Sequence, residues 1–297
     1  MIVPLALVST QRMTILQRML EKNRDCWYSN FSWRPGKLFD TVNRALTIFV
    51  SAKPRNKGET FSTAYLKWNA DSRDYLTPTV RYAECPRGRR AFWAPKLGER
   101  VESSILRKCL SIGKTVENFT GKSKNRVYYR TTGGLYWKVF TDFAPAFYVN
   151  GVAGNSSRET KFALTDKGHV QPAAAVLSSG VYWWWYTVTS NLRDLNPSDW
   201  RNFPVPEAAM NDPEMQQLGA EYIADLRRNS AMLVRNQKKT GRTETQSFKV
   251  QKSKPIIDRI DRVLAHHYGF TDEELDFIIN YDIKYRIGLD NLDRDEE

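Results

Sequence analysis

Apolar runs flank a polar stretch in the segment Cys26–Val50, around which the rest of the chain is interpreted. It contains two strand-like runs, Cys26–Phe31 and Ala45–Val50, rich in aromatic and β-branched residues. The polar stretch between them includes Pro35 and Gly36, which favour turns. The pattern therefore predicts a β-hairpin with a long connecting loop.

The loop of this hairpin carries one conspicuous apolar side chain, Phe39, among the basic residues Arg34, Lys37 and Arg44. An exposed phenylalanine on a basic loop can stack on a nucleobase, since every base offers a π-face. The alternative is that Phe39 caps the core of the sheet. The pattern alone favours this second interpretation.

The segment before the hairpin reads as a strand and a helix. Ile2–Val8 is apolar on both faces, as in a parallel strand covered by helices. Ser9 or Thr10 can cap a helix that runs to about Lys22. A strand, a helix and a hairpin would leave a long sheet edge exposed. We therefore expect residues 1–50 to be the last third of an α/β domain, whose beginning is lost by truncation or supplied by another polypeptide. The apolar face of the helix is expected to hold Met13, Leu16, Met19 and Leu20.

The middle of the chain reads mainly as β-structure. Glu102–Ile112 is a predicted helix, and residues 59–100 have no clear assignment. Gly133-Gly134 predicts a hairpin turn. In the run Tyr182–Tyr186, large rings on both faces of a strand would leave one set in the core and the other free for a partner. The predicted strands are Val127–Thr131, Leu135–Phe140, Ala146–Asn150, Glu159–Leu164 and Val181–Thr189.

The last third of the chain is predicted to be helical. Met210–Arg235 has Asp212 as its cap, Pro213 in its first turn and an apolar face that includes Leu233. Residues 236–254 are polar and basic, and they predict a linker or mobile loop. Two helices follow, Pro255–His267 and Thr271–Asn280, and the second opens with the capping box of Thr271 and Glu274.

The distribution of charge along the chain indicates the class of partner. The 297 residues carry a net charge of +12. Residues 51–160 hold 20 Lys/Arg against 9 Asp/Glu, a net of +11, whereas residues 271–297 hold 3 against 10, a net of −7. A basic middle in a chain with 9 Trp and 14 Tyr indicates a polyanionic partner, with nucleic acid first.

Other residue types exclude several classes of protein. Three widely spaced cysteines, Cys26, Cys85 and Cys109, argue against a disulfide framework and fit a reducing cytoplasm. With three histidines and no paired-cysteine motif, a zinc site is not expected. No apolar run approaches the roughly 20 residues of a membrane span, and the start lacks the basic region of a signal peptide. Membrane binding is therefore not expected.

The first fifty residues resemble the late motifs of the γ-class N6-adenine DNA methyltransferases, above all the type IIG-like restriction–modification enzymes. The segment IVPLALVSTQRMTILQRML looks like the "VP…S" strand and helix that follow the catalytic Asn-Pro-Pro-Tyr motif in that family. The next hairpin supplies a phenylalanine that stacks on the extruded adenine, and Phe39 occupies that place. The resemblance extends to YYRTTGGLYWKVF, NPSDWRNFPVP and HHYGFTDEELDFIINYDIKYRIG, which look like target-recognition and C-terminal segments.

The resemblance implies an α/β remnant, the end of a Rossmann-like methyltransferase sheet, followed by an α+β, β-rich target-recognition domain with C-terminal helices. Residues 1–55 would end the catalytic domain, residues 56–210 would bind double-stranded DNA, and residues 211–297 would form a helical region with the basic loop 236–254. The chain is thus expected to be the C-terminal portion of a cytoplasmic adenine-N6 methyltransferase.

Two elements that such an enzyme needs are not found in the sequence. One is the glycine-rich turn that accepts S-adenosylmethionine, and the other is the Asn-Pro-Pro-aromatic loop. Gly151–Gly154 lacks a following helix, and Asn196–Trp200 lacks the second proline, so both are rejected as substitutes. The resemblance places both elements before Met1. We therefore expect the cofactor to be bound by a missing N-terminal part or a separate polypeptide.

The acidic residues of the middle segment raise the alternative of a nuclease centre. Asp142 followed by Glu159-Thr160-Lys161 imitates the carboxylates and lysine of metal-dependent nucleases. Such spacings arise easily by chance, and the resemblance places this stretch in the recognition domain. No metal site is expected.

The remaining candidates are DNA-reading side chains. Arginine and lysine pair with guanine edges or phosphates, and asparagine pairs with adenine edges. In turns, asparagine and serine commonly bond their own backbone instead, so only about a third of the set is expected to touch DNA. The candidates are Arg34, Lys37, Arg89, Arg90, Arg126, Tyr129, Arg130, Tyr136, Trp137, Lys138, Asn150, Ser156, Ser157, Arg158, Lys161, Trp185, Asn191, Arg193 and Asn196.

Two other functions remain open at the level of sequence. One is a non-catalytic specificity subunit that binds DNA and partners a separate methyltransferase or nuclease. The other is an RNA-binding protein, which competition between duplex DNA and RNA would distinguish.

Overall fold

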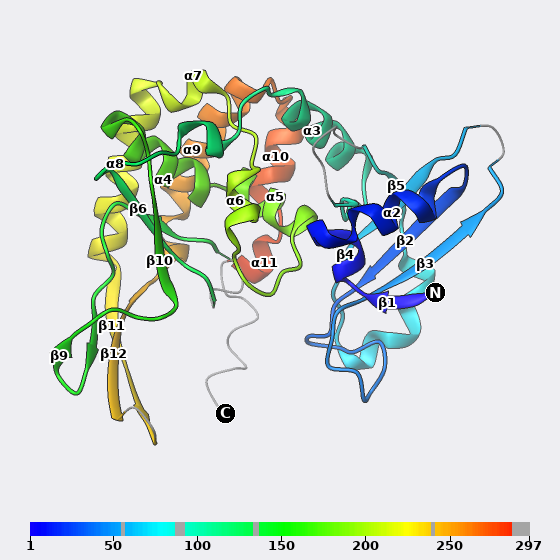
Figure 1. The fold of residues 1–297 in the computed structure, drawn as a ribbon, viewed down its shortest axis with the longest axis horizontal. Coiled ribbons are helices and arrows are strands. Elements are labelled where there is room, and N and C mark those ends of the chain that lie inside the picture. Colours follow the sequence, from blue (N-terminus) through cyan, green and yellow to red (C-terminus); the bar gives the residue numbers. More distant parts are fainter. Residues whose placement is uncertain (55–56, 87–92, 133–136, 239–240, 287–297) are drawn as a thin grey trace. The chain divides into compact units, whose positions relative to one another are not determined.

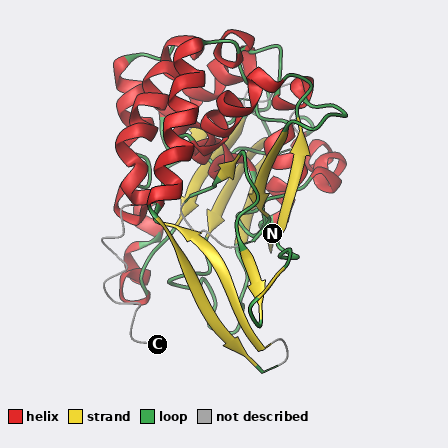
Figure 2. Cartoon of the chain, turned by 90° about the vertical axis from the view of Figure 1, so that its left-hand side faces the viewer, coloured by secondary structure: helices red, strands yellow, loops and turns green. Residues whose placement is uncertain are grey.

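The computed structural model describes residues 1–54, 57–86, 93–132, 137–238 and 241–286. The fold mixes helices with several sheets (Figures 1 and 2). Contacts divide the chain into two compact units. The first comprises residues 1–111 and 185–193, and the second comprises residues 112–184 and 194–297.

A five-stranded sheet in the order β1-β3-β2-β4-β5 organises the first unit. The predicted hairpin is confirmed, since β2 and β3 pair in antiparallel register from Asp25↔Ala52 to Phe31↔Leu46. Strand β3 lies between β1 and β2 and is antiparallel to both, whereas β4 is parallel to β2. The strands are β1 (Ile2–Pro4), β2 (Asp25–Phe31), β3 (Leu46–Ala52), β4 (Thr60–Leu66) and β5 (Ala83–Glu84), and the helices are α1 (Ala6–Ser9), α2 (Thr14–Glu21) and α3 (Arg100–Ser111), with 3₁₀ turns η1 (Gln11–Met13), η2 (Ala70–Tyr75) and η3 (Thr77–Thr79).

The predicted strand Ile2–Val8 is wrong in its length and its place in the sheet. Only Ile2–Pro4 is a strand, and it lies at the edge of the sheet, antiparallel to β3 and with Ile2 exposed. The chain turns at Leu5 into the short helix α1. The apolar residues after Pro4 are buried because they belong to this helix and its turn, not because a parallel strand is covered on both faces.

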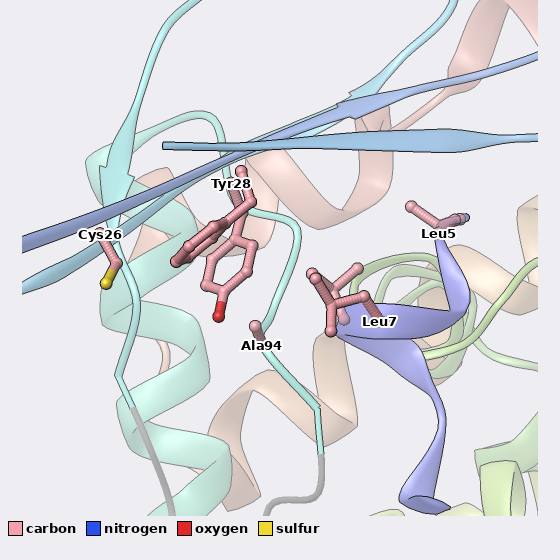
Figure 3. Packing of buried hydrophobic residues seen from close by; sticks show 7 residues of the cluster. Leu5, Leu7, Cys26, Tyr28 and Ala94 are labelled. Atoms are coloured by element: carbon pink, nitrogen blue, oxygen red, sulfur yellow. The ribbon is translucent and has the colours of Figure 1, made fainter. Parts of the chain in front are cut away.

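The core of the first unit forms where α1 meets the sheet. Leu5 and Leu7 pack with Tyr28 and Phe49 of the hairpin and with Ala94, which lies far along the chain. Figure 3 shows Leu7 and Tyr28 converging on Ala94. The Tyr28 and Phe49 rings lie 5.0 Å apart between centroids. This cluster fixes the hairpin against the N-terminal segment.

The second unit contains two sheets and most of the helices. Its sheets have the orders β10-β6-β7 and β11-β12-β8-β9. The strands are β6 (Arg126–Arg130), β7 (Phe140–Thr141), β8 (Phe147–Val149), β9 (Val152–Ala153), β10 (Glu159–Ala163), β11 (Ser230–Gln237) and β12 (Gly241–Phe248). The helices are α4 (Val170–Ser178), α5 (Gly180–Thr189), α6 (Pro197–Arg201), α7 (Glu207–Met210), α8 (Pro213–Arg228), α9 (Lys254–Tyr268), α10 (Asp272–Asn280) and α11 (Ile283–Arg286), with 3₁₀ turns η4 (Val116–Phe119), η5 (Lys167–His169) and η6 (Val250–Ser253). The residues of α5 from Trp185 onwards belong to the first unit.

The predicted strand Val181–Thr189 is wrong, because this segment is helix α5. Every residue of α5 is buried. A helix that is hydrophobic on all sides belongs in an interior, so the large rings need no solvent-facing side. The buried carboxylate of Asp261 in α9 accepts hydrogen bonds from the N–H groups of Gly180 and Val181, both at 3.1 Å. It thereby satisfies two of the backbone donors that the first turn leaves unpaired.

The predicted helix Met210–Arg235 is correct at its start and wrong at its end. Asp212 caps α8 by accepting the N–H of Glu214, and Pro213 occupies the first turn. The helix stops at Arg228, however, and Ser230–Gln237 forms strand β11. The expected basic loop contains its antiparallel partner, β12. Cross-strand pairing therefore overrides the helical spacing of the apolar residues.

Most of the other predicted elements are confirmed. Helix α3 and strands β6, β8 and β10 lie within a few residues of the predicted ranges. Helix α9 ends at Gly269, which has a positive φ of 67°, and α10 opens with the Thr271–Glu274 capping box. The Gly133-Gly134 turn lies outside the described residues.

The expected domain boundaries do not coincide with the two units. A boundary at residues 55/56 would separate β2 from β4, which pair side by side in one sheet. A boundary at residues 210/211 would separate α4 from α8 and α9, which pack together within the second unit.

Candidate nucleic-acid interface

The β10-β6-β7 sheet of the second unit presents one apolar face and one basic face. Val127, Tyr129 and Phe162 point to the same side and are buried. The Phe162 ring stacks on Trp200 at 4.0 Å between centroids. Because successive residues of a strand point to opposite faces, the alternate residues of β6 and β10 must lie on the other side.

This second side, which we call the outer face, is formed by Arg126, Tyr128, Arg130 and Lys161. Arg126 and Lys161 are exposed, and the Lys161 Nζ atom lies 5.8 Å from the centre of the Tyr128 ring. Basic side chains interleaved with an aromatic ring offer both charge for phosphates and a surface for bases or sugars. Tyr128, and not the predicted Tyr129, lies on this face, as strand alternation with Arg126 and Arg130 indicates.

Arg130 and Glu159 face one another across β6 and β10. Burial raises the pKa of the Glu159 carboxyl to about 7, and the charge of Arg130 only partly opposes this. The buried atoms Arg130 Nε and Glu159 Oε1 have no hydrogen-bond partner among the described residues, and neither does the nearby Thr132 Oγ1. Buried polar atoms normally have partners, so this end of the outer face can accept a polar ligand.

The turn that precedes β10 adjoins the outer face. Ser157 and Arg158 are exposed, and the Ser156 hydroxyl accepts the N–H of Arg158 at 3.3 Å. The backbone carbonyl of Arg158 accepts the N–H of Thr131 at 2.9 Å. The turn is therefore fixed to β6 while the Arg158 side chain remains available.

Three candidates are corrected because they lie in the interior. Tyr129 packs among Phe140, Phe162 and Trp200. Trp185 is only 2% exposed, since it lies on the buried helix α5. Burial also lowers the pKa of Lys138 to about 8. These three side chains cannot reach DNA in this structure.

Other candidates have structural partners. The Trp137 indole donates its Nε1 proton to the carbonyl of Arg286 at 2.8 Å, and the Arg286 guanidinium lies over its ring at 4.0 Å. Asn150 and Asn191 accept backbone N–H groups of Arg242 and Arg193, respectively. The Asn191 bond is the local contact expected of asparagine in turns, whereas the Asn150 bond joins it to the neighbouring strand β12. The exposed side chain of Arg193 is not part of the outer face.

The segment Asn196–Trp200 caps a helix. Asn196 and Asp199 form a capping box at the start of α6, in which the Asp199 carboxylate accepts the N–H of Asn196 at 2.7 Å. Gly151 belongs to the two-residue Asn150-Gly151 turn of the β8–β9 hairpin, where both residues have positive φ. Neither rejected motif has the shape of a cofactor loop. Among the described residues, no group of three or more His, Cys, Asp or Glu side chains could hold a metal ion.

In the first unit, the loop between β2 and β3 leaves the Phe39 ring 39% exposed. Its neighbour Leu38 packs against the cluster of Phe31, Trp68 and Leu76. Leu38 therefore caps this part of the sheet, which removes the main reason to place Phe39 in the core.

The Phe39 loop is held at several points. The Arg73 guanidinium donates to the carbonyl of Leu38 at 2.6 Å and pairs with Asp40 at 3.2 Å. The N–H of Gly36 donates to the Trp68 carbonyl at 2.7 Å. Arg34 is exposed and stacks over the Trp33 ring, and Lys37 is partly exposed. The loop thus presents one aromatic ring and two cations from a fixed backbone.

Arg89, Arg90 and Tyr136 lie outside the described residues. The predicted contacts that share the outer face or its adjoining turn are Arg126, Arg130, Ser156, Ser157, Arg158 and Lys161.

Helix α2 in the first unit buries a polar side chain and exposes apolar ones. The polar Gln17 is buried and donates to the carbonyl of Leu7 at 2.6 Å. Met19, which the sequence predicts to lie on the apolar face, is 69% exposed, and Ile15 is 74% exposed. Met19 lines a shallow hollow with Met1 and Val50, which are also exposed. Contiguous apolar surface of this kind marks an interaction site.

No protein-family model matches the chain, and no curated protein shows significant similarity to it. None of the helices in the described parts of the chain has the length and apolar character that a membrane crossing requires.

We predict that Glu159→Gln removes a pH-dependent component of stability. The folded-state pKa of about 7 is above the ordinary value of 4.5, so the stability contributed by this group is full below about pH 4.5 and is lost as pH rises through 7. The free energy of urea unfolding should fall from pH 5 to 8 less steeply in the variant than in the wild type. Glu117→Gln, an exposed glutamate of the same unit, is the control. Equal slopes for Glu159→Gln and the wild type would show that the carboxyl titrates normally.

Proposed function

We propose that this chain is the DNA-recognition and base-stacking portion of a site-specific DNA adenine-N6 methyltransferase of a restriction–modification system. The observation that carries the proposal is the loop that presents Phe39 beside Arg34 and Lys37 while Leu38 caps the core. An aromatic ring held clear of the core can stack on a base that has left the duplex. Double-stranded DNA is the proposed partner.

The order of elements in the first unit supports this proposal. The resemblance implies a strand, a helix and a hairpin that carries the phenylalanine. Residues 2–52 fold as β1, two short helices and the β2–β3 hairpin, with Phe39 in its loop. The hairpin's second strand is inserted next to β1, so the loop is anchored to the same sheet as the N-terminal strand.

The outer face supports the duplex-binding part of the proposal. Arg126 and Lys161 offer exposed charge on a rigid sheet, and phosphate contacts of this type position a protein on the duplex. The Glu159 carboxyl, whose pKa burial raises to about 7, lies on the same face. Its negative charge above pH 7 would oppose phosphate binding, so affinity is expected to be higher below this pH.

The candidate glycine turn does not fit S-adenosylmethionine, because it is a tight hairpin turn. We propose that another polypeptide segment binds the cofactor and docks on the apolar surface of α2. Two features support this. The exposed side chains of Ile15 and Met19 require a cover, and β1 is an edge strand that can accept a neighbour. The assembly is proposed to act in the reducing cytoplasm, where its three buried cysteine thiols are stable.

A non-catalytic specificity subunit would use the same basic outer face and the same apolar docking surface. The two functions differ in the role of Phe39, since a specificity subunit needs no ring to stack on an extruded base.

The duplex-binding prediction is that the purified chain binds duplex DNA with an affinity that falls as salt rises. Arg126→Ala combined with Lys161→Ala should lower the slope of log affinity against log salt by about 2, since each phosphate contact contributes about 0.9. Fluorescence anisotropy over a salt series measures this. Arg262→Ala, an exposed arginine on α9, is the matched control. A wild-type chain that prefers RNA in competition, or binds no duplex, would disprove the proposal.

The docking prediction concerns the polypeptide that carries the cofactor motifs, sought in the coding sequence next to this one. Ile15→Ser with Met19→Ser should abolish its co-purification with the chain, because the apolar contact area is lost. Val152→Ser is the control, since Val152 is an equally exposed apolar residue of the second unit. Undiminished association of the double variant would place the docking surface elsewhere.

The stacking prediction concerns the assembled enzyme. Phe39→Ala should lower the rate of DNA methylation roughly tenfold to hundredfold, since base–aromatic stacking contributes about 1–3 kcal/mol. Phe39→Trp should retain most of the rate, because it keeps an aromatic face. The preferred DNA site should not change. Methylation by Phe39→Ala at the wild-type rate would remove Phe39 from the site and favour the specificity subunit.

A further inference from the structure

The β11–β12 hairpin is a long two-stranded ribbon that the sequence did not predict. Its strands pair over eight residues each, from Ser230↔Phe248 to Gln237↔Gly241. Both views show it extending away from helices α8 and α9, which flank it in the chain (Figures 1 and 2). Strand β12 also pairs with the short strand β8, and β11 is the edge of the sheet.

The edge strand is exposed on both faces. Met232, Leu233 and Val234 are consecutive and are each 40–46% exposed. Since neighbouring residues of a strand point to opposite sides, neither side of this part of the ribbon is covered. Arg235 and Asn236 continue the exposed row towards the end of the strand. A run of this kind on a free edge is usually protected or used in binding.

The charge of the ribbon identifies the class of partner. Residues 230–248, which form the ribbon, hold 4 Lys/Arg and 1 Asp/Glu. That one acid, Glu244, is neutralised by Arg242 at 3.3 Å. An extended peptide could add to the edge strand through backbone bonds alone, but it would not explain this concentration of positive charge. A polyanion would.

The polar side chains favour DNA over a lipid surface. Asn236 on β11 can bond base edges, and Thr245 on β12 adds a hydroxyl group. Gln246 and Thr243 instead bond Ala146, Ser230 and Arg235 within the protein. The major groove of B-DNA admits a two-stranded β-ribbon. A lipid headgroup layer would use the charges and the apolar row, but not a set of amide and hydroxyl groups.

We propose that the β11–β12 ribbon enters a groove of duplex DNA, with Arg235 and Lys238 on phosphates and Leu233 against the apolar parts of the groove. This rests on the proposed DNA-binding function and adds a second contact region to it. The ribbon reads a stretch of duplex, whereas the outer face of the β10-β6-β7 sheet contacts the backbone.

The test compares variants of the full chain on duplex DNA over a salt series. Arg235→Gln with Lys238→Gln should lower the slope of log affinity against log salt by about 2. Leu233→Ser should weaken binding severalfold and leave the slope unchanged, because it removes an apolar contact and no charge. Arg262→Gln is the control for exposed charge in the same unit. Unchanged thermal unfolding of each variant shows that the fold is kept.

The outcomes separate the ribbon from the proposed function. In one outcome, the wild type binds duplex DNA, Arg126→Ala/Lys161→Ala weakens this binding, and the ribbon variants keep the affinity and the salt slope of the wild type. Only the ribbon assignment is then overturned. If the wild type binds no duplex, both are overturned. The last part of the experiment measures binding of the same variants to vesicles that contain phosphatidylserine. Ribbon variants that lose vesicle binding while retaining duplex binding would assign the ribbon to a membrane surface and overturn its place in a groove.

Discussion

A buried helix with large aromatic side chains on every side requires that the polar groups at its ends be satisfied inside the protein. Helix α5 meets this requirement with two charged residues. The Asp261 carboxylate accepts two N–H groups at its start. The Lys96 ammonium, itself buried, donates to the carbonyls of Val188 and Ser190 at its end, at 3.0 and 2.7 Å. These signs match the partial charges of a helix, positive at its N-terminus and negative at its C-terminus.

This arrangement has an energetic consequence for the rest of the second unit. Burial raises the pKa of Asp261 to about 6, and the positive charge of Arg286 opposes the rise. Arg286 is also buried, and its pKa is lowered. Removing one member of such a set leaves an uncompensated charge, which costs about 3–5 kcal/mol. Helix α11 is therefore coupled electrostatically to α9 through Arg286 and Asp261.

With this interior in place, the surfaces that remain fall into three kinds, and each fits one part of the proposed function. The outer face of the β10-β6-β7 sheet and the β11–β12 ribbon are basic and suit DNA. The loop of the β2–β3 hairpin presents a ring on a fixed backbone. Helix α2 presents apolar side chains and buries its glutamine, which suits a protein partner. Charge and hydrophobicity are thus segregated on different elements, as expected of a chain that binds a polyanion and a protein through separate surfaces.

The sequence by itself determined the elements whose signals are local. The β2–β3 hairpin, the Asp212 cap of α8, the Thr271–Glu274 capping box and the Gly269 terminus depend on neighbouring residues, and periodicity and turn chemistry predict them. The basic residues of β6 and β10 were also identifiable, because charge is read directly from the sequence.

Only the tertiary structure decided the rest. Tyr182–Tyr186 is equally apolar as a strand or a helix, and burial on all sides selects the helix. Residues 230–237 have helical spacing, but pairing with 241–248 makes them a strand. Packing against Trp68 places Leu38, and not Phe39, against the core. In each case the deciding contact joins residues far apart in the chain, so no local pattern could contain it.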